Sequence, residues 1–329
     1  MRFHSGLRLA CAALALLGVC LAAPGDAAAD PSKLAPEVGW NDGEQETPRT
    51  AALAGAARAF GGDVNGLFGN PANLATSRVY HLAALGQLWP EARRQSYGGA
   101  AVDSSTSRIA VGIGGFYSSQ DGDGIKRKSI DLRLGLAVPL ADRVFLGVTG
   151  KVLKLEQNGL GPLGESLASG GLKNSAIVNG LTFDAGLTVR PSSLISLAVV
   201  GTNLTNPGNS LRPLGLSGGI GVGQRNFSIE ADLGANFTTY DKTKLRTMIG
   251  GELLLADSYP IRAGYRFDQG QKSHLISGGL GYLDRSFGLE LSVQRTVSGP
   301  SSTALIASLQ LFLEGLGLAR GAEDIDLPQ

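Results

Sequence analysis

The sequence predicts an all-β protein, an antiparallel transmembrane β-barrel of about fourteen strands with an N-terminal helical or coil plug. The first observation behind this prediction is that apolar and polar residues alternate with a period of two along many segments. The second is that most of these segments are roughly 10 to 15 residues long. Globular strands usually have about 5 to 6 residues, whereas a tilted strand needs about 9 to 11 to cross a bilayer.

Residues 1–29 are expected to be a cleaved signal peptide. Arg2 and Arg8 form a positive end, Leu9–Ala23 is apolar, and Ala27–Ala29 supplies the small residues of a cleavage site. An apolar stretch of about 15 residues is shorter than the roughly 20 of a spanning helix. No later segment of the sequence reaches about 18 uninterrupted apolar residues, so a membrane form of the mature chain must cross with strands.

Cleavage at this point excludes several classes of protein. It removes both cysteines, Cys11 and Cys20, and with them a disulfide scaffold, a thiolate zinc site and a cysteine nucleophile. It also removes two arginines and Asp26, which leaves 27 basic and 27 acidic residues. A chain without net charge has no electrostatic footprint for nucleic acid. Its longest run of like charge is Lys126-Arg127-Lys128.

Two segments precede the predicted barrel. Residues 30–49 are acidic, contain three prolines and show little periodicity, which is typical of a linker, here a periplasmic one. Residues 50–78 are expected to form the plug. Within them Thr50–Phe60 is rich in alanine and is predicted to be helical, with Thr50 as the N-cap.

The barrel is expected over residues 79–313, followed by a tail over 314–329. In Ser129–Val138, for example, aliphatic residues occupy one face, and Asp131 and Arg133 the other. The candidate strands are Val79–Trp89, Ala92–Asp103, Arg108–Ser119, Lys128–Val138, Arg143–Gln157, Ala176–Arg190, Leu194–Leu204, Leu214–Gly223, Phe227–Tyr240, Leu245–Ala256, Tyr259–Asp268, Ser273–Leu283, Phe287–Thr296 and Thr303–Leu313.

Alternation alone fits a soluble sandwich as well as a membrane barrel. The lengths of the connections between candidate strands favour the barrel. Short connections such as Pro139–Asp142 alternate with longer ones such as Asn158–Ser175, as the periplasmic turns and outer loops of such barrels do. Charge also stays off one face of the clear strands, where an Arg or Lys facing lipid would cost about 2 to 4 kcal/mol. The aromatic content of 6% is low for a barrel.

The charged residues of the second face are candidates for lining the lumen. Two interpretations stay open: they line a transport path, or they neutralise one another in a filled interior. The lumen-lining candidates are Asp131, Arg133, Asp184, Arg190, Glu230, Asp232, Arg262, Arg266 and Glu290, together with Lys151, Arg246, Glu252 and Asp268.

Two enzyme-like motifs lack the structure that their chemistry needs. Gly215–Gly219 matches G-x-S-x-G, and Asp268 and His274 follow in triad order, but a nucleophile elbow requires a helix after the turn. Gly159–Gly164 has dinucleotide-binding spacing, but Pro162 interrupts it and no helix pattern follows. We therefore expect no enzyme and no cofactor.

Metal sites are not expected either. Only His81 and His274 remain after cleavage, and they fall on separate strands. Asp121 and Asp123 could touch a calcium ion, but the loop lacks a third acidic position and a distal Glu, so a polar turn is the better interpretation.

The segment Gly55–Ala75 reads GAARAFGGDVNGLFGNPANLA. It resembles the N-terminal signature of the FadL and PorV class of bacterial outer-membrane proteins, in which a Gly/Ala-rich segment leads through an Asp to an Asn-Pro-Ala motif. Asn73 stands where this class commonly has Gly. Similarity continues in Asp184–Asn206 and Ile261–Gln294. The plug-motif residues are Gly55, Asp63, Asn70, Pro71 and Ala72.

This resemblance implies a fourteen-stranded barrel that its N-terminal segment plugs, in the outer membrane of a Gram-negative bacterium after Sec-type export, with lipid around it. A strand number of fourteen is intermediate between that of filled barrels, which have about eight strands, and that of open porins, which have 16 to 18. A narrow or plugged lumen is therefore expected. The implied function is passive passage of hydrophobic small molecules. The alternative is a non-transporting scaffold or accessory protein with a secretion-related partner.

Overall fold

A computed structural model describes residues 45–121, 125–157, 176–206 and 211–313. These residues form fourteen strands and three short helices. The helices are α2 (Pro48–Ala52), α3 (Asp63–Phe68) and η3 (Pro71–Ala75). The strands are β1 (Tyr80–Trp89), β2 (Arg94–Asp103), β3 (Ala110–Gln120), β4 (Arg127–Ala141), β5 (Val144–Gln157), β6 (Ala176–Val189), β7 (Ile195–Thr202), β8 (Gly215–Gln224), β9 (Phe227–Asn236), β10 (Lys244–Leu255), β11 (Tyr259–Asp268), β12 (Ser273–Leu283), β13 (Phe287–Ser298) and β14 (Thr303–Leu313).

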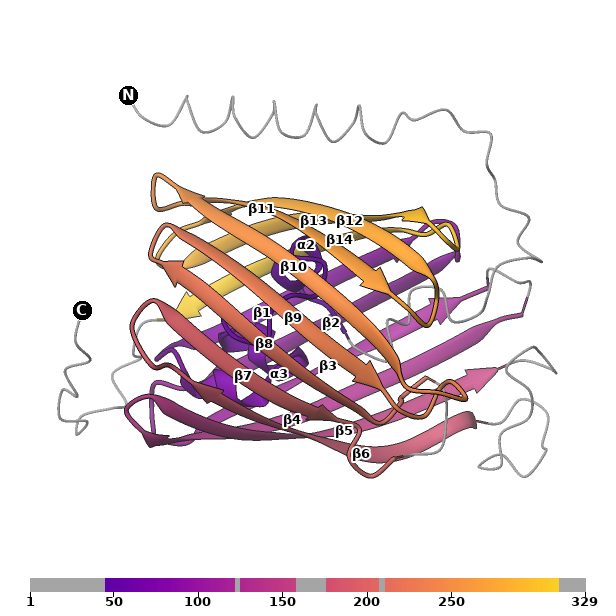
Figure 1. Cartoon of the computed structure of the whole chain (residues 1–329), viewed down its shortest axis with the longest axis horizontal. Helices are drawn as coiled ribbons and strands as arrows, with labels where there is room; N and C mark the ends of the chain where they lie inside the picture. The colour runs from indigo at the N-terminus through magenta and orange to yellow at the C-terminus, as the bar shows by residue number, and fades with distance from the viewer. Residues whose placement is uncertain (1–44, 122–124, 158–175, 207–210, 314–329) are drawn as a thin grey trace.

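The strands close into a single antiparallel barrel (Figure 1). Each strand pairs with its neighbours in sequence, and β1 pairs with β14, with Tyr80 opposite Leu313 and Leu88 opposite Leu305. Closure satisfies the main-chain hydrogen bonds of every strand and leaves no sheet edge. The predicted fold class is confirmed, and the bounds of β11, β12 and β14 agree with the sequence prediction residue for residue.

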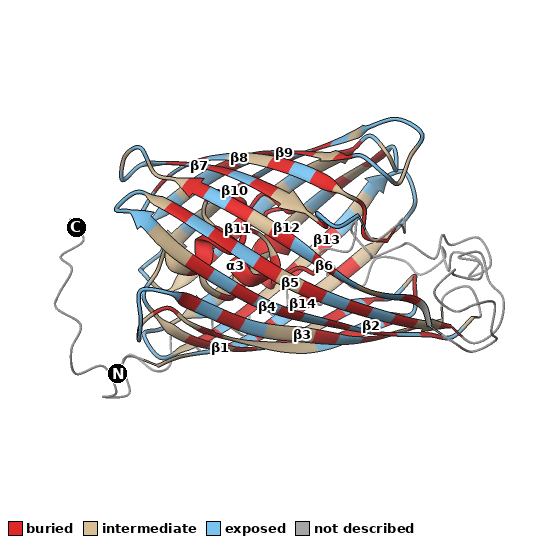
Figure 2. Ribbon diagram, turned by 90° about the horizontal axis from the view of Figure 1, so that it is seen from below, coloured by how far each residue is buried: buried red, intermediate tan, exposed pale blue. Residues whose placement is uncertain are grey.

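The barrel is apolar outside and polar inside, the reverse of a soluble protein. On β4 the side chains of Leu132 and Leu134 are 54% and 53% exposed, whereas Asp131 and Arg133 are 2% and 3% exposed. Figure 2 shows this alternation as bands of buried and exposed residues along the strands. Such a surface requires lipid around it, because water would leave the aliphatic side chains unburied.

In the part of the chain that the structure describes, no helix is both long and apolar enough to cross a membrane.

The two ends of the barrel differ in their connections. Short links such as residues 142–143 and 225–226 lie at the end where β1 begins and β14 finishes (Figure 1). The strand ends joined by the longer stretches of sequence, those of β5 and β6 and of β7 and β8, lie at the other end (Figure 1). Outer-membrane barrels have this arrangement, with short turns facing the periplasm.

The N-terminal segment from Gln45 to Val79, here called the plug, lies inside the barrel (Figure 1). Helix α2 packs against β11 to β14, α3 against β1 to β4, and η3 against β3 to β6. The segment therefore follows the inner wall around much of its circumference. Gln45, the first described residue, is already buried, five residues before the start of the plug expected from the sequence.

The prediction of one helix over Thr50–Phe60 is wrong. Helix α2 begins at Pro48, is capped by the Thr47 hydroxyl and has Leu53 as its C-cap. Ala54 and Gly55 then adopt positive φ angles of 55° and 94°, which a continuing helix cannot contain. The barrel offers hydrogen-bond acceptors to the following main-chain N–H groups, and these tertiary contacts override the helix propensity of alanine.

Candidate functional site: the plugged lumen

Two carboxylates of β9 hold the main chain of the plug. The N–H groups of residues 57 and 58 both donate to Asp232 Oδ2 at 3.0 Å, and those of residues 59 and 60 donate to the two carboxylate oxygens of Glu230. Glu230 and Asp232 are 2% and 4% exposed. Four consecutive N–H groups that have no helical partner are thereby satisfied, as buried main-chain groups must be. These two lumen-lining candidates contact the plug itself.

The carbonyl of Arg58 is the centre of a second set of contacts. Asn70 Nδ2 and Asn73 Nδ2 donate to this oxygen at 2.8 and 2.9 Å. Thr188 of β6 accepts from Asn70 Nδ2 at 2.8 Å and donates to Asn73 Oδ1 at 2.7 Å. Both asparagines are fully buried. Asn73 thus has a defined bonding role, and Thr188 is a plug contact that the sequence analysis missed, although it shares the inward face of Asp184.

The other plug-motif residues set the path of the chain. Gly55 needs its φ of 94°, and a Cβ there would lie 3.0 Å from Met248 Sδ. Asp63 begins α3 with a φ of 54° and accepts a hydrogen bond from the Ser77 hydroxyl. Pro71 begins η3, and Ala72 N donates to Asn70 Oδ1 at 3.1 Å, which caps this helix.

Ion pairs connect the start of the plug to β10, β11 and β13. Arg49 Nε lies 3.2 Å from Glu252 Oε2, Glu252 also binds Arg262, and Arg262 Nη1 lies 2.5 Å from Glu290 Oε1. In a separate contact, Arg266 Nη1 lies 3.5 Å from the carboxylate of the plug residue Glu46. The inward candidates Arg262, Arg266 and Glu290 are therefore charge partners of one another or of the plug.

Glycines on the inner wall make room for the plug. A Cβ on Gly147 would lie 2.3 Å from the Pro71 carbonyl carbon, and one on Gly186 would lie 2.0 Å from Asn70 Oδ1. On the opposite wall, a Cβ on Gly264 would lie 2.4 Å from the carbonyl carbon of Leu53. These distances are far below van der Waals contact, so no side chain fits between wall and plug. The high glycine content of the chain has part of its explanation here.

The inner faces of β4 to β6 carry a second polar group. Asp131 accepts from Arg133 Nε at 3.1 Å and lies 2.8 Å from Arg212 Nη2, while Lys151 Nζ lies 2.7 Å from Asp184 Oδ1. Arg133 Nη1 donates to the Phe68 carbonyl of the plug at 3.1 Å. The sequence analysis missed Arg212, because it belongs to a loop rather than to an alternating strand.

Of the remaining candidates, Arg246 pairs with Asp268 at 2.9 Å inside the barrel. Arg190 follows the last residue of β6, is half-buried and lies with its guanidinium carbon 5.6 Å from the centre of the Phe145 ring. Its burial lowers the pKa of the Arg190 guanidinium.

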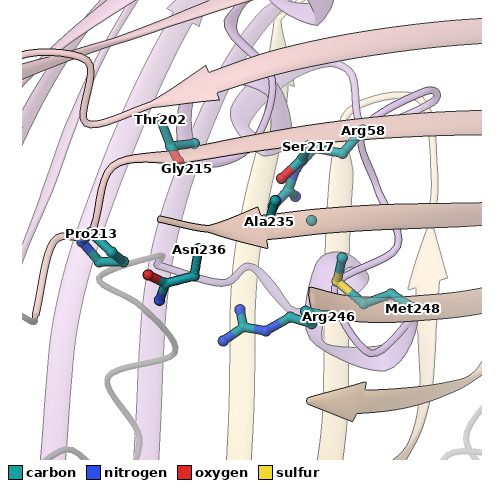
Figure 3. A pocket seen from close by; sticks show the side chains of 10 residues that line it. Arg58, Thr202, Pro213, Gly215, Ser217, Ala235, Asn236, Arg246 and Met248 are labelled. Carbon is teal, nitrogen blue, oxygen red and sulfur yellow. The ribbon is translucent and has the colours of Figure 1, made fainter. Parts of the chain in front are cut away.

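A small cavity lies between the plug and β7 to β10 (Figure 3). Its lining includes Arg58 of the plug and Ser217, Asn236, Arg246 and Met248 of the wall. Its volume is about 30 Å³. This space admits a water molecule or two but no aromatic ring, since a cavity known to bind benzene has about 150 Å³.

A larger hollow of about 530 Å³ lies on the lipid side of β2 to β4. Its lining has no charged residue and includes Gly99, Gly114 and Gly115, with Ile113 and Leu132 beside them. The wall is thin here: a Cβ on Gly114 would lie 2.9 Å from Leu67 Cδ2 of the plug. Leu67 belongs to a buried apolar cluster with Phe68, Leu74 and Phe116. The apolar hollow and the apolar side of the plug are thus separated by glycine backbone.

The structure does not assemble the triad suggested by G-x-S-x-G. Ser217 lies inside the barrel and lines the small cavity, and Asp268 pairs with Arg246. His274 Nδ1 instead lies 2.6 Å from the Tyr265 hydroxyl. The dinucleotide-like Gly159–Gly164 and Asp123 lie outside the described residues. In the described part of the chain, no group of three His, Cys, Asp or Glu side chains is placed to hold a metal ion.

No family model matches the sequence, and no curated protein sequence matches it significantly. Solved structures do match. The monoaromatic hydrocarbon channel CymD is 13% identical, covers 82% of this chain and 97% of its own, and has a TM-score of 0.62. The toluene transporter TbuX of Ralstonia pickettii is 12% identical over 82% of this chain and 99% of its own, with a TM-score of 0.62. The toluene transporter TodX of Pseudomonas putida is 14% identical over 82% and 98%, with a TM-score of 0.59.

These similarities, together with the apolar outer face and the internal N-terminal segment, define the class of protein: a plugged fourteen-stranded outer-membrane β-barrel. Within this class the chain has the FadL-like fold, as the resemblance at Gly55–Ala75 implied.

Proposed function

We propose that this barrel lets small hydrophobic molecules pass across the outer membrane by diffusion. The observation that carries the proposal is the uncharged hollow on β2 to β4, where only glycine backbone separates the lipid side from the apolar cluster of the plug around Leu67. The solved barrels of the same fold that transport toluene or conduct monoaromatic hydrocarbons support a cargo of this chemical class.

The route runs sideways through the wall rather than straight through the lumen. For straight passage the plug would have to move away from the inner wall. It would lose the four N–H contacts to Glu230 and Asp232 and its close packing against the glycines of the wall. Each lost buried hydrogen bond costs about 1 kcal/mol or more. The hollow on the lipid side has no charged residue, so an apolar molecule reaches the wall without desolvating a charge. To pass Gly114 it must part β3 from β2 or β4, whose main-chain pairing is continuous there, with Arg133 opposite Gly114 on the inner face. In this proposal the inward charged residues neutralise one another and fasten the plug.

A bulky substitution in the hollow tests the route. Ala101→Trp fills the hollow from β2, and the matched control Ala263→Trp adds the same side chain to the outward face of β11. We expect Ala101→Trp to lower uptake of an apolar fluorescent probe at least fivefold in vesicles that contain the barrel, and the control to behave as the unmodified chain. Equal uptake by both variants would refute the sideways route.

Deletion of Thr50–Leu67 tests the role of the plug. We expect higher conductance in a planar bilayer, because this deletion removes most of α2 and most of α3 from the lumen, while the barrel stays heat-modifiable on a gel. Unchanged conductance would show that the segment does not close the lumen.

A non-transporting accessory protein is the second candidate. The observation that favours it is the number of buried contacts that fasten the plug, from the four N–H groups bound by Glu230 and Asp232 to the amides of Asn70 and Asn73. This function predicts unchanged probe uptake in all of these variants and a secretion-related protein recovered in stoichiometric amount by crosslinking.

A further inference from the structure

The longest run of like charge in the sequence, Lys126-Arg127-Lys128, has no part in the functions proposed above. Arg127 points into the barrel, 1% exposed, and donates to Gln157 at 2.9 Å. Lys126 and Lys128 are exposed and share the outward side of the chain with Ile130. Because successive side chains of a strand point to opposite faces, the arginine of this run points inward and its two lysines point outward, away from the barrel.

The height of these lysines follows from β4 itself. Its outward residues from Ile130 to Leu140 are all aliphatic. Ten residue steps of about 3.3 Å, tilted by about 40°, span roughly 25 Å, which is the height of the apolar band of outer-membrane barrels. Lys128 comes directly before this run, at the end of the barrel opposite the short links. It therefore lies at the level of the lipid head groups of the outer leaflet.

The neighbouring strand repeats the change from apolar to basic. On β5, Val148 and Val152 face outward within the band, and Lys154 follows as the next outward residue. Lys154 is in register with Ile130, one outward position from Lys128. Its Nζ lies 2.6 Å from Glu156 Oε1, with both side chains about half exposed. Such exposed pairs are weak, so Glu156 does not prevent Lys154 from binding another anion.

Aromatic residues mark the same boundary on β2 and β3. Tyr97 and Tyr117 are 60% and 45% exposed, lie opposite each other, and Tyr117 is in register with Ile130. Ser119, the next outward residue of β3, is in register with Lys128. Tyrosines are enriched where hydrocarbon meets head groups. Lys128 therefore lies one outward position beyond this aromatic row, on the side away from the apolar band, and Lys154 lies in the row itself beside Ile130.

We propose that Lys126, Lys128 and Lys154 form a docking site for the phosphate groups of outer-leaflet lipids. A basic side chain at a membrane surface attracts the head group of an anionic lipid. Here the apolar face directly below the lysines holds the acyl chains of the same lipid. The site binds a lipid phosphate and not free phosphate, because free phosphate gains nothing from the apolar face. The inference rests on the orientation of the barrel in the membrane and not on transport.

Lipid competition measured by native mass spectrometry tests this site. The full barrel is purified in detergent and offered phosphatidic acid, which carries a phosphate monoester, and phosphatidylcholine in equal amounts. We expect the double variant Lys128→Gln/Lys154→Gln to retain at least fivefold less phosphatidic acid than the unmodified chain. Lys128→Arg/Lys154→Arg keeps both charges and should retain it.

The matched control is Lys242→Gln/Lys272→Gln, which removes two lysines from loops at the same end of the barrel. Equal losses in the control and the test variant would show diffuse charge attraction and overturn the site. Displacement of phosphatidic acid by millimolar inorganic phosphate would overturn its assignment to a lipid. Heat-modifiability confirms that each variant is folded. Probe uptake is read in parallel, so failure of this site and failure of the transport proposal are distinguishable.

Discussion

At the scale of single residues, the plug depends on side chains that bond in more than one direction. Asn70 donates to the Arg58 carbonyl and to Thr188, and accepts from Ala72 N. A buried amide that uses donor and acceptor together cannot be replaced by a carboxylate of the same shape, because a carboxylate only accepts.

Asn70→Asp is therefore expected to loosen the plug by about 2 to 4 kcal/mol, since two donated hydrogen bonds are lost and a charge is buried. The measurement is the rate of trypsin cleavage after Arg58, which is 2% exposed in the folded chain. Asn65→Asp is the control, because Asn65 Oδ1 accepts from the Thr47 hydroxyl and a carboxylate keeps that bond. Equal protection of Arg58 in both variants would contradict the bonding role of Asn70.

Glu91 lies in the turn between β1 and β2 and binds residues of β13 and β14, next to the β1–β14 pairing that closes the barrel. It accepts from Thr303 N at 3.0 Å and Thr303 Oγ1 at 2.6 Å, and Arg295 Nη1 lies 2.6 Å away. Burial alone would raise the pKa of Glu91, but these hydrogen bonds and the charge of Arg295 outweigh it and lower this pKa below its usual range. A lowered folded-state pKa adds stability above the unfolded pKa, and this stability is lost as pH falls through the folded pKa.

Glu91→Gln is expected to lower the free energy of unfolding by about 1 kcal/mol at pH 7 and to have no effect once pH falls below the lowered pKa. Urea unfolding of the barrel in detergent at pH 7 and at acidic pH measures both values. Glu156→Gln serves as the control and should leave the midpoint unchanged, because its carboxylate makes an exposed pair with Lys154. A pH-independent effect of Glu91→Gln would exclude the charged form as the stabilising one.

At the scale of elements, the plug fits against the wall because the inward-facing glycines of the strands leave room for it. Outward-facing glycines do not contact the plug. Gly250 and Gly251 are neighbours on β10 but face opposite sides of the barrel. A Cβ on Gly250 would lie 2.7 Å from Leu53 Cβ, whereas one on Gly251 would have Ser228 O at 3.7 Å as its nearest neighbour.

Gly250→Val should displace α2, at a cost of about 1 to 3 kcal/mol for overpacking, whereas Gly251→Val should be tolerated. Trypsin cleavage after Arg49 and single-channel conductance report displacement of the helix. If trypsin cleaves after Arg49 at the same rate in both valine variants and their conductances are equal, the inward glycines of the wall do not position the plug.

At the scale of the whole molecule, the membrane fixes which side of each strand is apolar. Leu134 lies in the middle of the outward aliphatic run of β4, and Leu140 at its end near the short turns, with exposed fractions of 53% and 58%. The exposed fractions of Leu134 and Leu140 are similar, so exposure does not distinguish them. Their depths in the bilayer differ.

Leu134→Arg is expected to cost about 2 to 4 kcal/mol and Leu140→Arg about 0 to 1 kcal/mol, because the cost of a charge falls toward the interface. The fraction of heat-modifiable barrel after refolding into vesicles measures the difference. Similar yields for the two variants would mean that the outward face of β4 does not cross the bilayer in this register.

The sequence by itself determined the strands and their faces. Alternation of period two is a local property, and lipid outside with polar groups inside forces it on every strand. The fourteen segments and the directions of Leu134 and Arg133 could therefore be derived from it, with the bounds of β11, β12 and β14 correct to the residue. The same alternation identified the charged residues of the second face, although not their partners.

The tertiary structure alone decided the conformation of the plug and the pairing of the charges. The N–H groups that end the helical path after Leu53 bind Asp232 and Glu230, 170 to 175 residues away in sequence. Likewise, Asp131 meets Arg212 across a loop. Local propensity contains no information about partners so distant, because the closed barrel brings them together. For this reason the alanine-rich segment indicated a long helix that the inner wall does not allow.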